Sequence, residues 1–226
     1  MKISVISPSI RPEGLKILQQ CLEEQTLPTN EFEWHVDLGL KRKGHDLNAA
    51  FNRMIKRSKG DLIVFYEDYT KIMPDGLERF WKAYQDNPNT LFTTPLGKVD
   101  NYGDSPRWDW RATKQNHSQI DYTDCLWRTC ELDWGAIPKS ILYDIGGFDE
   151  ELDKNWSMDN VSVGLRADAL GYKFKCVFTN PAVAIDHDKI MAHPFRERWN
   201  PQSSNLMMQR YSLLNYKLPY LLDNNN

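Results

Sequence analysis

Strand-like apolar runs alternate with amphipathic helical segments over the first 97 residues. The expected strands are residues 2–7, 32–38 and 61–66. The expected helices begin at Pro12, Asp46 and Pro74. Proline suits the first turn of a helix, aspartate is a good N-cap, and Gly60 ends the second helix. Strands that alternate with helices over short connections predict an α/β fold with a doubly wound, mostly parallel sheet.

The second half of the chain has a different pattern. Residues 98–133 are polar and aromatic without a clear period, which favours a long surface excursion. A short helix closed by Gly146 and Gly147 is then expected within residues 137–152, and another helix is expected from Asp159, stopped by Gly171. A strand follows to Phe178, and "AVAIDH" is a last apolar run that ends on Asp186 and His187.

Bulk composition limits the class of protein. A chain of 226 residues suits one large domain, and a net charge of -3 argues against a generally basic surface for nucleic acid. No apolar stretch is long enough to span a bilayer, and the N-terminus lacks a signal-peptide pattern. The four cysteines are scattered without a CxxC pair, so we expect a cytoplasmic protein with reduced thiols.

Acidic residues follow two of the expected strands. In "LIVFYEDYT" five apolar residues lead directly into Glu67 and Asp68, and Asp37 lies near the end of the run 32–38. Ligands of doubly wound sheets bind beyond the carboxyl ends of the strands. These acids are therefore either solvated strand ends or ligand-binding groups at the rim of a sheet.

The order of these features resembles the nucleotide-sugar glycosyltransferases of the GT-A fold, family 2 in particular, over about residues 2–187. Five segments carry the resemblance: "ISVISPSIRPEGLKILQQCLEEQT", "HVDLG", "HDLNAAFNRMIKRSKGDLIVFYED", "WGAIPKSILYDIGGFDEEL" and "MDNVSVGLRADALGYKF". It implies a single GT-A domain over 1–226, with a nucleotide-sugar-binding half (1–97), an acceptor and catalytic half (98–198) and a C-terminal tail (199–226). A compact form without a membrane anchor is similar to viral or phage-type members.

The resemblance implies a donor site with a divalent cation, Mn²⁺ or Mg²⁺. The family's acidic motif, commonly DxD, falls on Glu67, Asp68 and Tyr69, so the usual final acid is replaced by tyrosine. Asp68 is the expected metal ligand and Glu67 the ribose contact. His187 matches the position of a third metal ligand, although a structural histidine is equally expected at a strand end.

Further donor contacts follow from the same resemblance. Asp37 matches the acid that faces the base or ribose, and Pro8, Ser9 and Arg11 match the segment that lines the nucleotide pocket. For Arg11 an ordinary surface position is nearly as well supported.

On the acceptor side, Asp159 matches the catalytic base of the family, and Met158 replaces the usual preceding Glu. An inverting transfer needs one carboxylate to take the acceptor's hydroxyl proton. Asp159 also suits a helix cap, and both roles are compatible. Trp134 and Gly135 match an acceptor-lining turn, and Trp156 is placed to stack on a sugar; core packing is the alternative for each.

The predicted function is the inverting transfer of a sugar from a nucleotide-diphosphate sugar, such as a UDP-sugar, to a hydroxyl of a glycan, protein, lipid-linked sugar or modified DNA. Two alternatives stay open. The departures at Tyr69 and Met158 suit a non-catalytic nucleotide-sugar or sugar-binding protein of the same fold. A sugar nucleotidyltransferase shares the sheet architecture, but it needs a Gly-rich loop after the first strand, and "SPSIRPEG" is not one.

Overall fold

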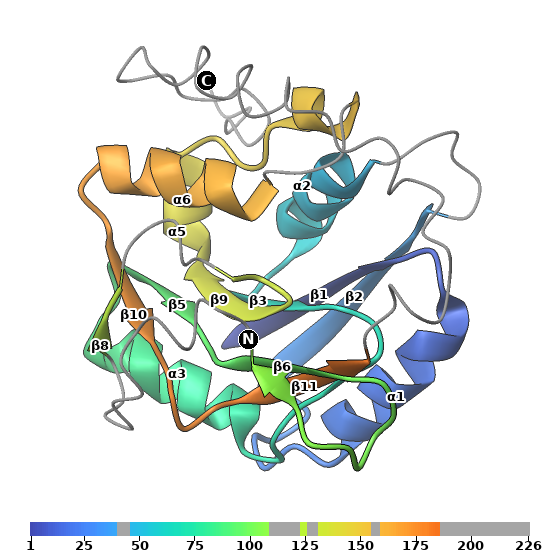
Figure 1. Ribbon diagram of the computed structural model, residues 1–226. Coiled ribbons are helices and arrows are strands. Elements are labelled where there is room, and N and C mark those ends of the chain that lie inside the picture. The colour runs from blue at the N-terminus through green and yellow to red at the C-terminus, as the bar shows by residue number, and fades with distance from the viewer. Residues whose placement is uncertain (40–45, 109–122, 126–130, 155–158, 186–226) are drawn as a thin grey trace.

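The protein is an α/β sandwich built on one seven-stranded sheet (Figure 1). The computed structural model describes residues 1–39, 46–108, 123–125, 131–154 and 159–185. In spatial order the strands of the sheet are β2 (Phe32–Leu38), β1 (Ile3–Ser9), β3 (Leu62–Tyr66), β9 (Trp134–Pro138), β5 (Thr90–Thr93), β10 (Lys173–Cys176) and β8 (Thr123–Asp124). The pairings make β2, β1, β3, β5 and β10 run in one direction, while β9 and β8 run in the other. The expected mostly parallel α/β sheet is confirmed.

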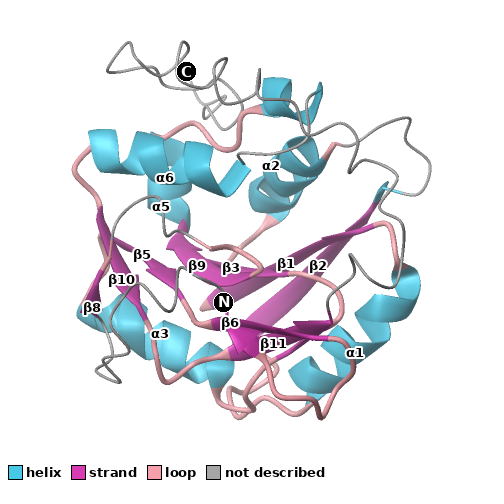
Figure 2. Cartoon of the chain, in the orientation of Figure 1, coloured by secondary structure: helices cyan, strands magenta, loops and turns pink. Residues whose placement is uncertain are grey.

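Helices cover both faces of this sheet (Figure 2). One face carries α1 (Pro12–Glu23) and α3 (Gly76–Asp86). The other carries α2 (Leu47–Arg57), α5 (Lys139–Asp144) and α6 (Asp159–Ala169). Each face has its own cluster of buried apolar side chains, so the sheet is the shared wall between two hydrophobic cores.

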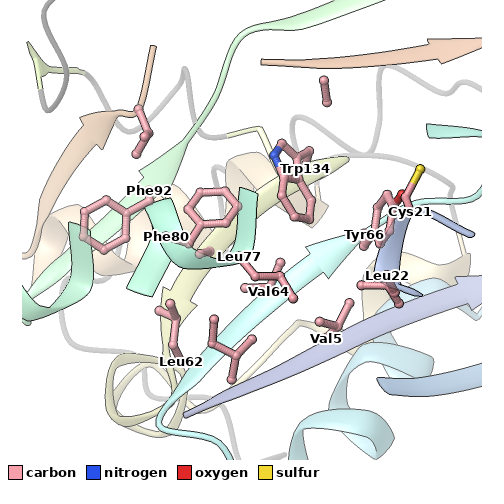
Figure 3. Close-up of a cluster of buried hydrophobic side chains, with 14 of the residues drawn as sticks. Val5, Cys21, Leu22, Leu62, Val64, Tyr66, Leu77, Phe80, Phe92 and Trp134 are labelled. Carbon is pink, nitrogen blue, oxygen red and sulfur yellow. The ribbon is translucent and has the colours of Figure 1, made fainter. Parts of the chain in front are cut away.

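Strand β3 shows why the run "LIVFY" is apolar throughout. Successive side chains of a strand point to opposite faces. Leu62, Val64 and Tyr66 accordingly pack in the core with α1 and α3 (Figure 3), while Ile63 and Phe65 pack in the core with α2, α5 and α6. All five are completely buried. A strand covered on both faces cannot alternate with polar residues, so a continuous apolar run is the expected pattern.

A second, four-stranded sheet includes the short strand that follows Glu67 and Asp68. Its order is β4 (Thr70–Lys71), β11 (Ala182–Ile185), β6 (Leu96–Val99) and β7 (Arg107–Trp108). The backbone N–H of Ile185 donates to the carbonyl of Tyr69 at 3.2 Å, which ties the end of β11 to the segment after β3. Residues 98–133 are therefore not wholly irregular, because they contain the end of β6 together with β7 and β8.

The short helix expected within residues 137–152 is α5, which follows directly on strand β9 after Pro138, and the 3₁₀ helix η3 (Glu150–Lys154) begins later in the same stretch. Gly146 and Gly147 do close α5, with φ of 77° and 84°. Asp46 occupies the N-cap position of α2 but makes no side-chain cap hydrogen bond.

The described residues also bear on membrane insertion and cysteine pairing. None of the helices in the described ranges combines the length and apolar character needed to cross a bilayer. Cys21 is a buried free thiol, and Cys130 lies outside the described residues.

Candidate functional site

The carboxyl ends of β1, β2 and β3 meet at one edge of the main sheet. In the β1–β2 register Pro8 is opposite Asp37 and Ser9 is opposite Leu38. Strand β3 runs parallel to β1 on its other side and ends at Tyr66, just before Glu67 and Asp68. Residues predicted from three separate segments to contact a donor therefore lie at the same edge, where α/β sheets bind ligands.

Asp68 is the centre of a small polar cluster at this edge. Its side chain is almost fully buried. The Ser9 hydroxyl donates to Oδ2 at 2.5 Å, Arg11 Nε donates to Oδ2 at 3.1 Å, and Arg11 Nη2 donates to Oδ1. A two-pronged guanidinium–carboxylate pair is among the strongest hydrogen-bonded arrangements in proteins. Arg11 is thus partly buried and paired with Asp68.

Tyr69 encloses this ion pair from one side. Its ring centroid is 5.6 Å from the Arg11 guanidinium, and its hydroxyl donates to Glu13 Oε1 at 2.9 Å. The backbone of Tyr69 is in the left-handed region, with φ of 55°, and Gly14 leaves the space that the ring occupies. Burial, together with the hydrogen bond to Glu13, raises the pKa of Tyr69 to about 12, so its hydroxyl keeps its proton.

Asp37 is also paired with an arginine. It is buried and accepts from Arg53 Nε at 2.9 Å, while Arg53 Nη2 donates to Asp46 at 3.2 Å. Arg53 comes from the exposed face of α2. The sequence pattern marks it only as a polar helix position, and nothing local indicates that it reaches the end of β2.

Glu67 links the carboxyl edge of the sheet to β9. Its backbone N–H donates to the carbonyl of Asp133 at 2.9 Å, one residue before β9 begins at Trp134. The Trp134 ring is fully buried between Tyr66 and Phe80, at centroid distances of 5.1 and 4.9 Å (Figure 3). Core packing is therefore its observed role, and the ring offers no face to an acceptor in this conformation.

Gly135 has a steric reason to be glycine. A Cβ there would lie 2.5 Å from the carbonyl oxygen of Glu131 and 3.1 Å from that of Phe92. Both neighbours are backbone atoms, which cannot move aside as a flexible side chain can. Gly135 therefore permits the close packing of β9 against its surroundings, whatever further contact it makes.

Glu131 connects two parts of the chain in a way that sequence reasoning missed. Its buried Oε1 accepts from the backbone N–H groups of Leu132 and Asp133, at 3.0 and 3.2 Å, and from Asn160 Nδ2 at 3.1 Å. It thus ties the first turn of α6 to the start of β9. Glu131 lies in a segment without periodicity, so no sequence signal identified it.

Asp159 is the first residue of α6, and only its backbone is described. The preceding 3₁₀ helix supplies Asp153, whose carboxylate accepts from the backbone N–H groups of Asn48 and Ala49 at 2.8 and 3.0 Å. Asp153 thereby caps α2, the role expected for Asp46. Burial raises the pKa of Asp153 to about 6, even though these hydrogen bonds favour the charged form.

The predicted metal site has only one ligand in the described part of the chain. The other predicted ligand, His187, lies outside it. Trp156, which is predicted to stack on a sugar, also lies outside the described residues. Among the described residues there is no group of three histidine, cysteine or acidic side chains placed to hold a metal ion. Asp68 itself is engaged by Ser9 and Arg11. With Arg11 in this position, the described side chains do not fit a divalent cation.

Taken together, the architecture and the edge of acidic side chains define a GT-A fold. Solved structures of S. aureus TarS, a GT-A-type glycosyltransferase, share it. The structure of TarS residues 1–349 in complex with UDP-GlcNAc matches with a TM-score of 0.69 and 14% identity over 96% of this chain and 68% of that one. The corresponding complex with UDP has a TM-score of 0.68 and 15% identity, over 92% of this chain and 64% of that one.

A longer TarS structure matches with a TM-score of 0.67 and 14% identity. There the match covers 96% of this chain but only 40% of the TarS chain, so this protein spans less than half of that relative. A scan against protein-family models finds no match, and neither does a search of curated protein sequences. The similarity is thus one of fold.

Proposed function

We propose that the protein is a glycosyltransferase that moves a sugar from a nucleotide-diphosphate sugar to an acceptor hydroxyl with inversion. The observation that carries the proposal is the convergence of Ser9, Asp37 and Asp68, from three separate segments, at the carboxyl edge of a GT-A sheet. The TarS structures that hold UDP and UDP-GlcNAc support a UDP-sugar as the donor.

In this proposal Asp37 contacts the base or ribose, Glu67 contacts the ribose, and the segment with Pro8, Ser9 and Arg11 lines the nucleotide. The acceptor oxygen attacks the anomeric carbon as the bond from that carbon to the diphosphate oxygen breaks. Asp159 takes the hydroxyl proton, and the nucleoside diphosphate leaves with the bonding electrons. The step is a single displacement, so it needs no covalent intermediate with the enzyme.

Two parts of the predicted site stay predictions. The first is a divalent cation, Mn²⁺ or Mg²⁺, held by Asp68 and His187, because His187 lies outside the described residues. A sugar-stacking contact through Trp156 is the other, for the same reason. The acceptor is a hydroxyl of unspecified origin.

The test compares the protein with the variant Asp159→Asn. Nucleoside diphosphate release is measured with a panel of nucleotide sugars, and UDP affinity and thermal melting are measured alongside. We expect the variant to lose about 10²–10⁴-fold in turnover, because an amide cannot accept the proton. Folding should be preserved, because asparagine starts a helix about as well as aspartate does.

Asp168→Asn is the matched control, since Asp168 is an exposed carboxylate near the other end of α6. It should leave turnover unchanged. Undiminished turnover of Asp159→Asn with normal melting would remove Asp159 from the mechanism. Binding of nucleotide sugars without any release by the unmodified protein would favour the non-catalytic alternative.

A further inference from the structure

We propose that the Arg11 guanidinium is the built-in cation of the donor site, so that a nucleoside diphosphate binds there without a divalent metal ion. The inference rests on the proposed function and concerns how the same site neutralises the donor's diphosphate. It follows from the disagreement between the acidic motif, which implies a metal, and the side chains that surround Asp68.

The geometry leaves part of the guanidinium available to a ligand. A guanidinium carries five N–H donors, and Arg11 uses Nε and one N–H of Nη2 to bind Asp68. The remaining donors, on Nη1 and Nη2, have no hydrogen-bond partner among the described residues. The Arg11 side chain is 20% exposed, so it is not sealed inside the core. Planar paired donors of this kind match phosphate oxygens.

Arg11 is held in place before any ligand arrives. Its backbone N–H donates to Ser9 Oγ at 2.8 Å, and the same hydroxyl donates to Asp68. Asp68 fixes the edge of the guanidinium, and the Tyr69 ring lies against its face. Ordering a long arginine side chain ordinarily opposes binding, and here the fold has already ordered it.

A metal ion and Arg11 are alternative partners of Asp68. A cation that ligated this carboxylate would replace both guanidinium hydrogen bonds and would sit beside a positive charge. The position at which the family commonly has its further acid is Tyr69, whose ring supports Arg11 instead of adding a ligand. The tyrosine at position 69 and the Arg11–Asp68 pair therefore both favour a site in which Arg11, and not a metal ion, supplies the positive charge.

The experiment measures UDP affinity by calorimetry in EDTA and in Mn²⁺ for the full chain and its variants. The unmodified protein should bind UDP with the same dissociation constant in both, within about threefold. Arg11→Gln should weaken binding in EDTA by at least about tenfold, since a hydrogen bond to a charged group is lost. Arg79→Gln is the matched control: Arg79 is paired with Asp75 at 2.6 Å on α3, and its loss should leave UDP affinity unchanged.

Arg11→Gln also leaves the buried Asp68 without its countercharge, which tends to destabilise a fold. The double variant Arg11→Gln/Asp68→Asn removes both charges and is the second test. It should melt close to the unmodified protein and still bind UDP at least about tenfold more weakly in EDTA.

The possible results separate this inference from the proposed function. UDP binding that requires Mn²⁺ would overturn the role of Arg11 and leave the glycosyltransferase proposal standing. Equal UDP affinity of Arg11→Gln and the unmodified protein in EDTA would also overturn it. Failure of UDP, GDP, dTDP, ADP and CDP to bind in either buffer would overturn both proposals.

Discussion

Gly14→Ala should destabilise the protein by about 1–2 kcal/mol, although alanine is the better helix former. Gly14 lies in the first turn of α1 and is buried. A Cβ at this position would lie 2.4 and 2.5 Å from two ring carbons of Tyr69 and 3.0 Å from Cβ of Asp68. Ordinary contact begins at 3.4 Å, so the ring must retreat by about 1 Å, the difference between 3.4 and 2.4 Å.

The expected loss of stability in Gly14→Ala is the balance of two free-energy terms. Alanine in place of glycine favours a helix by up to about 1 kcal/mol, and overpacking costs roughly 1–3 kcal/mol. The Tyr69 ring cannot retreat without cost, because its hydroxyl bonds Glu13 and its face contacts Arg11. Its backbone is already in the left-handed region, which further limits the adjustment. The overpacking term should therefore exceed the gain in helix propensity.

A double-mutant cycle in urea isolates the contact. In a Tyr69→Ala background the ring is absent, so Gly14→Ala should become neutral or stabilising by up to about 1 kcal/mol. The coupling energy between the two positions should then be about 1–3 kcal/mol. An identical effect of Gly14→Ala in both backgrounds would refute the idea that Tyr69 fills the space above Gly14.

Two further predictions concern stability. Asp153 has a pKa of about 6 in the folded protein, above its usual value of 3.8, so the folded state keeps a proton that the unfolded state has lost between those pH values. As pH rises from 4 to 7, the free energy of unfolding of the unmodified protein should therefore fall by about 1–2 kcal/mol more than that of Asp153→Asn. Urea titrations at several pH values measure both proteins. A difference between them that stays constant with pH would contradict the prediction. Trp134→Ala should cost about 3–5 kcal/mol in urea unfolding because the ring is completely buried. Trp108→Ala, at a ring with 44% exposure, should cost less than about 1 kcal/mol, and similar losses at the two positions would contradict the core assignment of Trp134.

Features set by local periodicity were predictable from the sequence. The apolar run of β3, the stripe on α2 and the proline at the start of α1 each reflect the environment of one element. The fold class follows from their alternation. Strand β2 was predicted with its observed bounds, because a polar segment that contains Pro28 precedes it and Gly39 follows it directly.

Strand β9 was not predictable in the same way. It lies antiparallel between β3 and β5, so its conformation depends on partners more than 40 residues away, such as Val64 opposite Ala136 and Phe92 opposite Ala136. The short segment "WGAIP" runs directly into α5, and Ile137 has the same spacing to Ile141 that a helix face would have. A local pattern cannot separate a buried strand that leads into a helix from one longer helix.

The acids of the site were predictable, whereas their partners were not. Asp37 and Asp68 can be recognised from the sequence because each lies at or just after the end of an apolar strand. The pairing of Asp37 with Arg53 and of Asp68 with Arg11 arises only when the chain folds. Asp153 similarly caps α2 from 105 residues away, at Asn48, in place of the adjacent Asp46. Hydrogen bonds between distant segments leave no periodic trace in the chain, so the charge balance of a site is a property of the folded protein.

Tyr69 illustrates how the structure changes the interpretation of a sequence departure. As a missing acid it only weakens the case for a metal ion. In the fold it belongs to a unit with Gly14, which leaves room for the ring, and Arg11, which the ring supports against Asp68. A carboxylate in its place would compete with Asp68 for the guanidinium and would lack the apolar face that contacts Gly14. The loss of the acid and the presence of a fixed guanidinium are therefore one structural feature, and both are accounted for if the positive charge at this edge comes from the chain itself.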